Sequence, residues 1–247
     1  MTSPTSSSDL SRRDEIAANL AAVEERIEQA CREAGRARSE ITLIAVTKTR
    51  PAADVRILSE LGVRDVGENR DQEAAGKASE CAELPLTWHF IGQLQTNKVR
   101  SVAGYADVVH SVDRPRLVSA LGREAVRAGR RIGCLIQVDL DPSEGPADGP
   151  GERGGVRPDG VLDLAALVAE AEGLRLDGIM AVAPLEADPG PAFARLAEVA
   201  EAVRKVHPSA TTVSAGMSGD LSQAVAHGAT HVRVGTALLG RRKPFVR

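Results

Sequence analysis

The chain begins with an amphipathic pattern. Over residues 10–36, the apolar residues Ile16, Leu20, Val23 and Ile27 recur at spacings of three and four. Such spacing places apolar side chains along one side of a helix, where they pack against a core. We therefore predict an N-terminal helix that lies ahead of the main fold.

Beyond this helix, short runs rich in β-branched residues alternate with longer stretches of Ala, Leu, Glu and Arg. The short runs predict strands and the longer stretches predict helices. Eight strands are predicted, over residues 41–46, 64–66, 87–91, 107–110, 132–138, 175–180, 211–213 and 231–234. The helices predicted between them include residues 115–128, 162–172, 191–206 and 221–227.

Strands and helices that alternate through short connections are typical of a parallel sheet, and eight repeats favour closure into a barrel. We predict an α/β fold: a single (β/α)8 TIM-type barrel over residues 10–247, with the extra N-terminal helix. An open doubly wound sheet is the alternative. We expect residues 1–9 to form a disordered tail. The Gly- and Pro-rich stretch 141–155 is predicted to be a long loop, either mobile or a lid.

Composition narrows the class of protein. Hydrophobic residues make up 43% of the chain and charged residues 26%, as in ordinary globular proteins. A net charge of -3 and an aromatic content of 2% argue against nucleic-acid binding. The cysteines and histidines lack the spacing of a disulfide framework or a metal site. Because the sequence shows neither a signal peptide nor a membrane-spanning run, we expect a cytoplasmic protein.

Lys48 directly follows the first predicted strand. Functional groups of a barrel gather at the C-terminal ends of its strands, so this position lies where chemistry is expected. Only five of the 31 basic residues are lysines, so arginine supplies most of the routine surface charge. A lysine that loses its proton attacks an aldehyde, whereas arginine stays protonated. On position alone, a solvated surface cation is the commoner interpretation.

Two strings near the C-terminus predict an anion site. The first, SAGMS at 214–218, follows the seventh strand and precedes a helix, where free backbone N–H groups and the helix dipole favour an anion. The second, RVGT at 233–236, ends the eighth strand, and barrels frequently bind phosphate between these two loops. The simpler interpretations are a helix cap with a turn glycine for the first string, and an ion pair for Arg233.

Other candidates follow the second and third strands. Glu68 and Asn69 follow the second strand, and Asn69 is either a ligand contact or a helix cap. His89 lies between two aromatic residues on the third strand, and we interpret it as a structural histidine. The string GQLQTNK at 92–98 follows that strand.

Taken together, these strings resemble the pyridoxal phosphate homeostasis protein family, the YggS/PROSC type. The resemblance rests on five motifs in the same order: AVTKT (45–49), VGEN (66–69), WHFIGQLQTNK (88–98), SAGMS (214–218) and RVGT (233–236). It runs from the N-terminal helix almost to the C-terminus. Each motif alone is weak evidence, but five in order are specific.

The resemblance implies a fold related to the barrel domain of alanine racemase and a pyridoxal 5'-phosphate (PLP) site. By this resemblance, Lys48 carries the cofactor as a Schiff base, Arg233 faces the pyridine nitrogen and Asn69 lies near the cofactor. The residues implied around the phosphate are Ser214, Met217, Ser218, Gly235 and Thr236.

A few positions depart from the family's usual pattern. Arg70 stands where the family often has Tyr, Gln93 where it usually has Pro, and Gly219 where it often has Asp. The loop 141–155 is longer than expected, which puts contacts from that side in doubt.

An arginine beside the pyridine nitrogen leaves that nitrogen unprotonated and makes the cofactor a poorer electron sink. Racemases with such an arginine use a second base, a tyrosine near a second domain. This sequence stops seven residues after Gly240, its only tyrosine is Tyr105, and we expect no second domain.

We therefore predict a non-catalytic PLP-binding homeostasis protein. It is expected to be a monomer whose partners are PLP and the apo-forms of PLP-dependent enzymes. An amino-acid racemase is one alternative. A barrel that binds another phosphorylated metabolite, with Lys48 in an ion pair, is the other.

Overall fold

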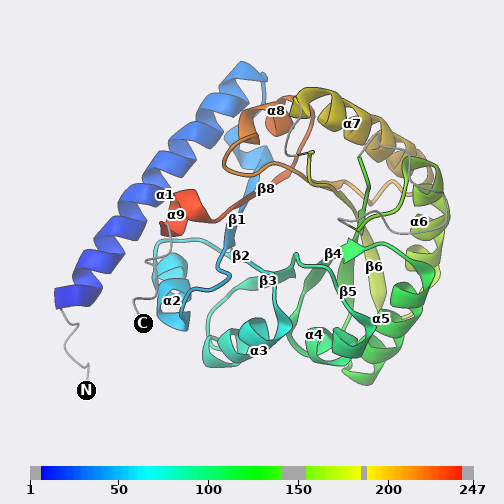
Figure 1. The fold of residues 1–247 in the computed structure, drawn as a ribbon, viewed down its shortest axis with the longest axis horizontal. Helices are drawn as coiled ribbons and strands as arrows, with labels where there is room; N and C mark the ends of the chain where they lie inside the picture. Colours follow the sequence, from blue (N-terminus) through cyan, green and yellow to red (C-terminus); the bar gives the residue numbers. More distant parts are fainter. Residues whose placement is uncertain (1–6, 141–153, 185–187, 241–247) are drawn as a thin grey trace.

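Eight parallel strands close into a barrel in the computed structural model, which describes residues 7–140, 154–184 and 188–240 (Figure 1). Each strand pairs with the next, and β8 pairs with β1. This closure excludes the open sheet and confirms the predicted (β/α)8 barrel. The strands are β1 (Thr42–Val46), β2 (Asp65–Glu68), β3 (Thr87–Phe90), β4 (Val108–Val112), β5 (Ile132–Gln137), β6 (Leu174–Met180), β7 (Thr212–Ser214) and β8 (His231–Val234).

The predicted strands agree with these bounds to within two residues. The largest differences are at β2, predicted over 64–66, and β4, predicted over 107–110. Both predictions rest on hydrophobicity alone, and each ends its strand two residues too early. The hydrogen-bonded ladder of β2 continues through Gly67 and Glu68, which are polar or small but buried.

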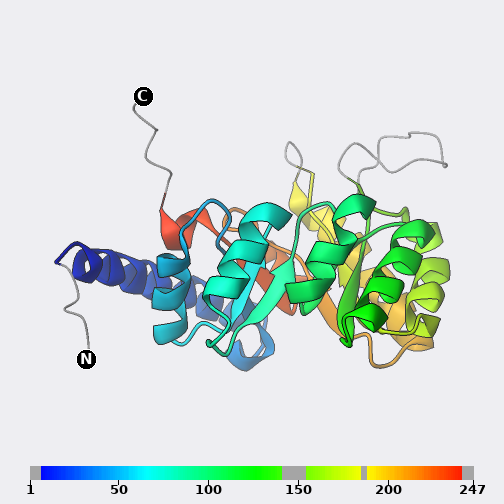
Figure 2. The same ribbon diagram turned by 90° about the horizontal axis from the view of Figure 1, so that it is seen from below.

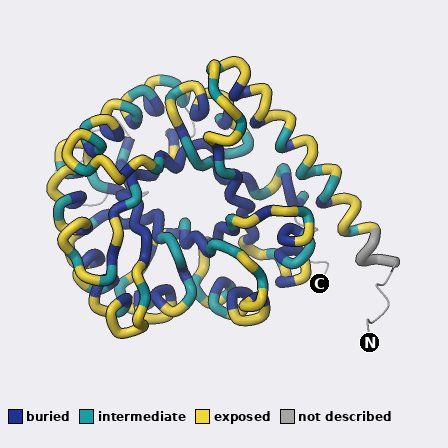
Figure 3. Tube along the Cα trace, turned by 180° about the vertical axis from the view of Figure 1, so that it is seen from behind, coloured by how far each residue is buried: buried dark blue, intermediate teal, exposed yellow. Residues whose placement is uncertain are grey.

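Helices surround the barrel and cover the outer faces of its strands (Figure 1). At α5, for example, Leu121 is fully buried in the same cluster as Ile132 and Cys134 of β5. Buried residues form the inner ring of the fold, and exposure rises outward (Figure 3). The helices are α1 (Ser7–Glu33), α2 (Ala52–Glu60), α3 (Asp71–Glu80), α4 (Val99–Tyr105), α5 (Pro115–Arg127), α6 (Val161–Glu170), α7 (Pro189–Val206), α8 (Leu221–Ala226) and α9 (Thr236–Leu239).

The predicted N-terminal helix is α1, which lies outside the ring, beside α8 and α9 (Figures 1 and 2). Its predicted apolar face is buried: Ile16, Val23 and Ile27 pack in one cluster with Leu221 of α8 and Leu238 of α9. The helix therefore covers the part of the barrel where β8 meets β1.

Two predicted segments lie wholly or partly outside the described residues. Of the expected tail 1–9, residues 1–6 are not described, and α1 begins at Ser7. Of the expected loop 141–155, the structure describes only the last two residues, Gly154 and Gly155.

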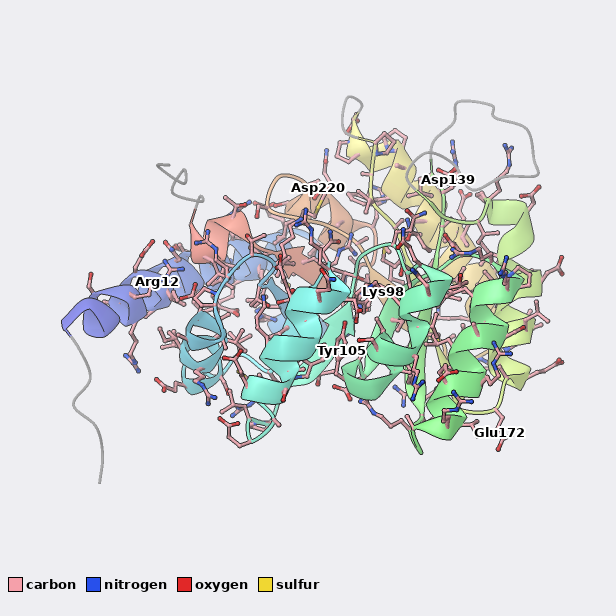
Figure 4. The ribbon with its side chains drawn as sticks, turned by 60° about the horizontal axis from the view of Figure 1, so that its bottom comes forward. Arg12, Lys98, Tyr105, Asp139, Glu172 and Asp220 are labelled. Carbon is pink, nitrogen blue, oxygen red and sulfur yellow. The ribbon has the colours of Figure 1, made fainter. Side chains whose placement is uncertain are left out.

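The two ends of the barrel are distinct (Figure 4). Asp139 and Asp220, which follow β5 and β7, lie at the C-terminal end, while Glu172, which precedes β6, lies at the opposite end. Within the described ranges, we find no helix whose length and apolar content would let it cross a membrane.

Candidate functional site

All eight residues predicted to bind a cofactor lie on or after four strands that are neighbours in the barrel: β7, β8, β1 and β2. The site therefore spans the β8–β1 closure, which joins the two ends of the chain. The residues are Lys48 after β1, Asn69 after β2, Ser214, Met217 and Ser218 on and after β7, and Arg233, Gly235 and Thr236 on and after β8.

Lys48 lies in a turn just beyond β1, and its side chain is exposed. Its amine has no hydrogen bond or ion pair with any residue that the structure describes. The alternative of an ion-paired lysine therefore finds no partner in the described ranges. An exposed, unpaired amine is available to a ligand that enters from the C-terminal face.

The turn that carries Lys48 has a strained backbone. The Arg50 N–H donates to the Thr47 carbonyl at 3.0 Å and closes the turn. Thr49 has a φ of 63°, and among the described residues it alone combines a positive φ with a side chain. A β-branched residue rarely adopts this conformation, so surrounding contacts must hold it. The Thr49 N–H donates to Glu73 Oε2 at 2.8 Å.

Beneath the turn lies a buried ionic cluster of Thr47, Glu68 and Lys77. Thr47 Oγ1 donates to Glu68 Oε1 at 2.6 Å. Lys77 Nζ donates to the same Glu68 oxygen at 2.5 Å and to the Thr47 carbonyl at 2.8 Å. Burial raises the pKa of Glu68, and the hydrogen bonds from Lys77 and Thr47 oppose that rise. The cluster links β1, β2 and α3 directly below Lys48.

Arg233 is a buried cation on β8. Its guanidinium donates to the Ser214 carbonyl at 2.8 Å, to Ser214 Oγ at 2.7 Å and to the Ala181 carbonyl at 2.8 Å. No described carboxylate forms an ion pair with it, so the predicted alternative of an acidic partner is not found there. Burial lowers the pKa of Arg233 to about 10, which still leaves it protonated at neutral pH. A buried charge without a counter-ion favours an anion or a lone pair nearby.

The loops after β7 and β8 approach this cation. Gly216 has a φ of 90°, and an added Cβ would lie 2.6 Å from the Ala224 Cβ, so the SAGMS turn requires glycine. The Met217 N–H is already occupied, because it donates to Asp220 Oδ1 at 2.5 Å. Asp220 occupies the N-cap position of α8, but its side chain makes no capping hydrogen bond to that helix. Ser218 is half-buried and Thr236 is exposed, so their hydroxyls remain near the surface.

Inside the barrel, below this face, is a chain of hydrogen-bonded histidines. His89 Nε2 lies 2.9 Å from Asp65 Oδ1, and His89 Nδ1 lies 2.8 Å from His110 Nε2. The ring of His231 lies 6.4 Å from that of His89 across the barrel. His89 is thus a structural histidine, as predicted. Burial lowers the pKa of His110 well below its ordinary value and lowers that of His231 to about 4.

Lys77 and His110 were not among the residues predicted from the sequence. Lys77 shares one face of α3 with the buried residues Ala74 and Ala78, and a lysine at that spacing on an apolar face is a detectable signal. His110 ends a predicted strand, but its partner His89 is on a different strand, so neither spacing nor periodicity connects them.

Thiol and metal chemistry find little support in the described residues. Cys31, Cys81 and Cys134 are buried free thiols, and burial raises the pKa of each. A thiol with a raised pKa is a poor nucleophile. No group of three or more potential metal ligands occurs within the described ranges.

Comparison with known proteins identifies relatives along nearly the whole chain. Residues 18–243 match the family model of the alanine racemase N-terminal domain. The pyridoxal phosphate homeostasis protein of Mycobacterium tuberculosis is 45% identical over 251 aligned positions, which cover 94% of this chain and 95% of the relative. The corresponding protein of Escherichia coli is 39% identical and covers 93% of this chain and 97% of its own.

A solved structure agrees with these relatives. PipY from Synechococcus elongatus, determined with PLP bound, superposes with a TM-score of 0.77 at 35% identity, covering 91% of this chain and all of PipY. The motifs, the closed barrel and these similarities agree. The chain belongs to the pyridoxal phosphate homeostasis protein family, which has the fold of the alanine racemase N-terminal domain.

Proposed function

We propose that this protein binds PLP through a Schiff base on Lys48 and carries it in exchangeable form, without strong catalytic turnover. One observation supports this most directly. Within the described residues, the exposed Lys48 amine just beyond β1 has no hydrogen bond or ion pair, and the buried Arg233 on the adjacent strand β8 has no ion pair.

The residues present fit a phosphorylated aldehyde. PLP supplies an aldehyde that condenses reversibly with amines, and Lys48 carries an exposed amine at this face. Arg233 provides a fixed positive charge beneath it. Gly235, the N-cap residue of α9, packs closely against β1, because an added Cβ would lie 3.3 Å from the Val46 carbonyl oxygen.

In this proposal each remaining residue binds or orients. The hydroxyls of Ser218 and Thr236 and the backbone of Gly235 hold the phosphate, and Asn69 hydrogen-bonds the cofactor from the β2 side. Ser214 acts indirectly, because its hydroxyl and carbonyl are already used to orient Arg233. Met217 contributes its side chain and position, since its N–H is bonded to Asp220.

The chemistry of two side chains supports carriage of the cofactor rather than catalytic turnover of a substrate. Arg233 donates hydrogen bonds and stays protonated at neutral pH, so it is no general base. Tyr105, the tyrosine considered as a second base, is on α4 outside the barrel, with a buried hydroxyl. Burial raises its pKa above the ordinary value, with Asp71 and Glu68 adding to the rise, so it does not ionise at neutral pH.

The biological role follows from reversible attachment. Free PLP is a reactive aldehyde, and capture on Lys48 lowers its concentration while leaving it available. The names of the curated relatives support such a homeostatic role. We propose that the recipients are apo-forms of PLP-dependent enzymes. The expected monomer stays a prediction, which analytical ultracentrifugation of the purified protein would test.

The test is covalent trapping. Purified protein is mixed with PLP, reduced with borohydride and digested, and the modified peptide is identified by mass spectrometry. We expect the label on Lys48, an absorbance band that appears on adding PLP, and loss of both in Lys48→Ala with the fold intact. Lys98→Ala is the matched control, because Lys98 follows β3 at the same end of the barrel, and it should keep the label (Figure 4).

Three results would count against the proposal. A label that persists in Lys48→Ala would refute the assignment of the amine, and absence of any label would favour a barrel that binds another phosphorylated metabolite. Appreciable racemisation of a standard amino acid by the pure protein would refute the non-catalytic role.

A further inference from the structure

The buried cluster of Thr47, Glu68 and Lys77 lies too close to Lys48 to be explained by stability alone. Lys77 is a lysine with a side chain only 8% exposed, and Glu68 is fully buried. Buried ion pairs contribute little net stability because of their desolvation cost, so one beside a binding residue suggests a specific role. All of its contacts with β1 are made through Thr47, the residue before Lys48.

The cluster fixes the turn on its N-terminal side. The Thr47 carbonyl accepts from both Lys77 Nζ, at 2.8 Å, and the Arg50 N–H, at 3.0 Å. The Thr47 N–H donates to the Gly67 carbonyl at 2.9 Å, and its hydroxyl to Glu68. Every hydrogen-bonding group of Thr47 is therefore used, and the residue has no freedom to rotate.

The other side of the turn is held from the same helix. Glu73, one turn of α3 before Lys77, accepts the Thr49 N–H at 2.8 Å and so keeps Thr49 at its unfavourable φ of 63°. Lys48 is thus flanked by two residues that α3 holds in place, while its own side chain bonds to none of the residues that the structure describes. Strain kept by surrounding contacts is typical of functional positions.

We infer that Thr47, Glu68 and Lys77 are positioning residues that hold the Lys48 amine where it attaches to the cofactor. This inference rests on the proposed function. The positioning role predicts that the cluster sets the ratio of covalently attached cofactor to cofactor that is bound without a covalent bond. The affinity of the phosphate and ring contacts, which come from β7, β8 and β2, should be independent of it.

The decisive variant is Thr47→Val, which keeps the β-branched shape and removes the hydroxyl. Two quantities are measured for it: the fraction of protein trapped by borohydride at saturating PLP, and the affinity for pyridoxine 5'-phosphate, which lacks the aldehyde. We expect the ratio of attached to unattached cofactor to fall roughly fivefold, as for loss of one buried hydrogen bond. The pyridoxine 5'-phosphate affinity should stay within about twofold, since its contacts are unchanged.

Two controls separate positioning from general destabilisation. Thr47→Ser keeps the hydroxyl and should restore the trapped fraction. Thr42→Val makes the same change at the other end of β1 and should leave it unchanged. Lys77→Met should lower the trapped fraction as Thr47→Val does, and thermal unfolding measures its separate effect on the fold. Should Thr47→Val not fold, Lys77→Met decides in its place, because it removes the other side-chain hydrogen bond to Thr47.

Labelling of wild-type protein and of Thr47→Val separates failure of the proposed function from failure of the positioning role. If wild-type protein is not labelled on Lys48, the proposed function and this inference both fail. If wild-type protein is labelled and Thr47→Val is labelled equally, only the positioning role fails. If both the trapped fraction and the pyridoxine 5'-phosphate affinity fall together, the cluster supports the whole site, and the specific role is refuted.

Discussion

Acid should destabilise this barrel through His231, and the size of the effect follows from its environment. His231 lies on β8 with its ring directed inward, where His89, Asp65 and Asp177 are its charged or titratable neighbours. Its Nδ1 lies 2.9 Å from Thr230 Oγ1. Burial lowers its pKa from the ordinary 6.5 to about 4, because a charged imidazolium is poorly solvated there.

The direction of this pH effect on stability follows from proton uptake by the unfolded chain. Between pH 6.5 and 4 the unfolded chain binds a proton at His231 that the folded chain does not. The free energy of unfolding therefore rises with pH across this window. The contribution of His231 is lost as the pH falls through it. At about 1.4 kcal/mol per pH unit, the contribution of His231 is roughly 3 kcal/mol. His110 acts in the same direction, whereas the raised pKa of Glu68 acts in the opposite one.

The assay is urea denaturation of wild-type protein and His231→Gln at pH 7 and pH 4. The wild type should lose roughly 3 kcal/mol more than the variant over this range. His227→Gln, at the end of α8 outside the barrel, is the control and should match the wild type. Equal losses in wild type and His231→Gln would refute the reasoning, because the buried neutral imidazole would then contribute nothing to the pH dependence.

Three further substitutions test the packing of the barrel and of the loop beside the site. Leu121→Ala on α5 removes a fully buried side chain, so the free energy of unfolding in urea should fall by roughly 2–5 kcal/mol. Gly92→Ala places a Cβ 2.2 Å from the Asn69 carbonyl oxygen, so the loop after β2 must shift and the PLP affinity, measured by absorbance titration, should fall several-fold. Gly104→Ala on α4 meets open space and should instead raise stability by about 0.5–1 kcal/mol, and an unchanged affinity in Gly92→Ala would contradict the expected shift.

The barrel was predictable because its signals are local. Most strands contain a short apolar run, and Lys48 and Arg233 can be placed at strand ends from the runs of β1 and β8. The N-terminal helix was equally readable, since Ile16, Val23 and Ile27 mark one face and are all buried. Closure itself was inferred from the number of repeats, and the β8–β1 pairing confirms it.

The ionic cluster and the histidine chain were not predictable, because both depend on barrel register. Glu68 was singled out as a candidate, yet its partners Thr47 and Lys77 lie 21 and nine residues away. His89 and His110 meet because β3 and β4 are neighbours and both side chains point inward. Periodicity assigns a residue to a face, but the pairing of strands decides which residues meet on that face.

Because the candidate site lies across the β8–β1 closure, the site forms only at a late step of folding. Lys48 is synthesised before Arg233, and their strands become neighbours only when β8 pairs with β1. A nascent chain on the ribosome, or one cut short before β8, therefore lacks a complete site even if its first strands are folded. A ligand held from both sides also ties the two ends of the polypeptide together, so its release and the opening of the barrel at this point are thermodynamically coupled.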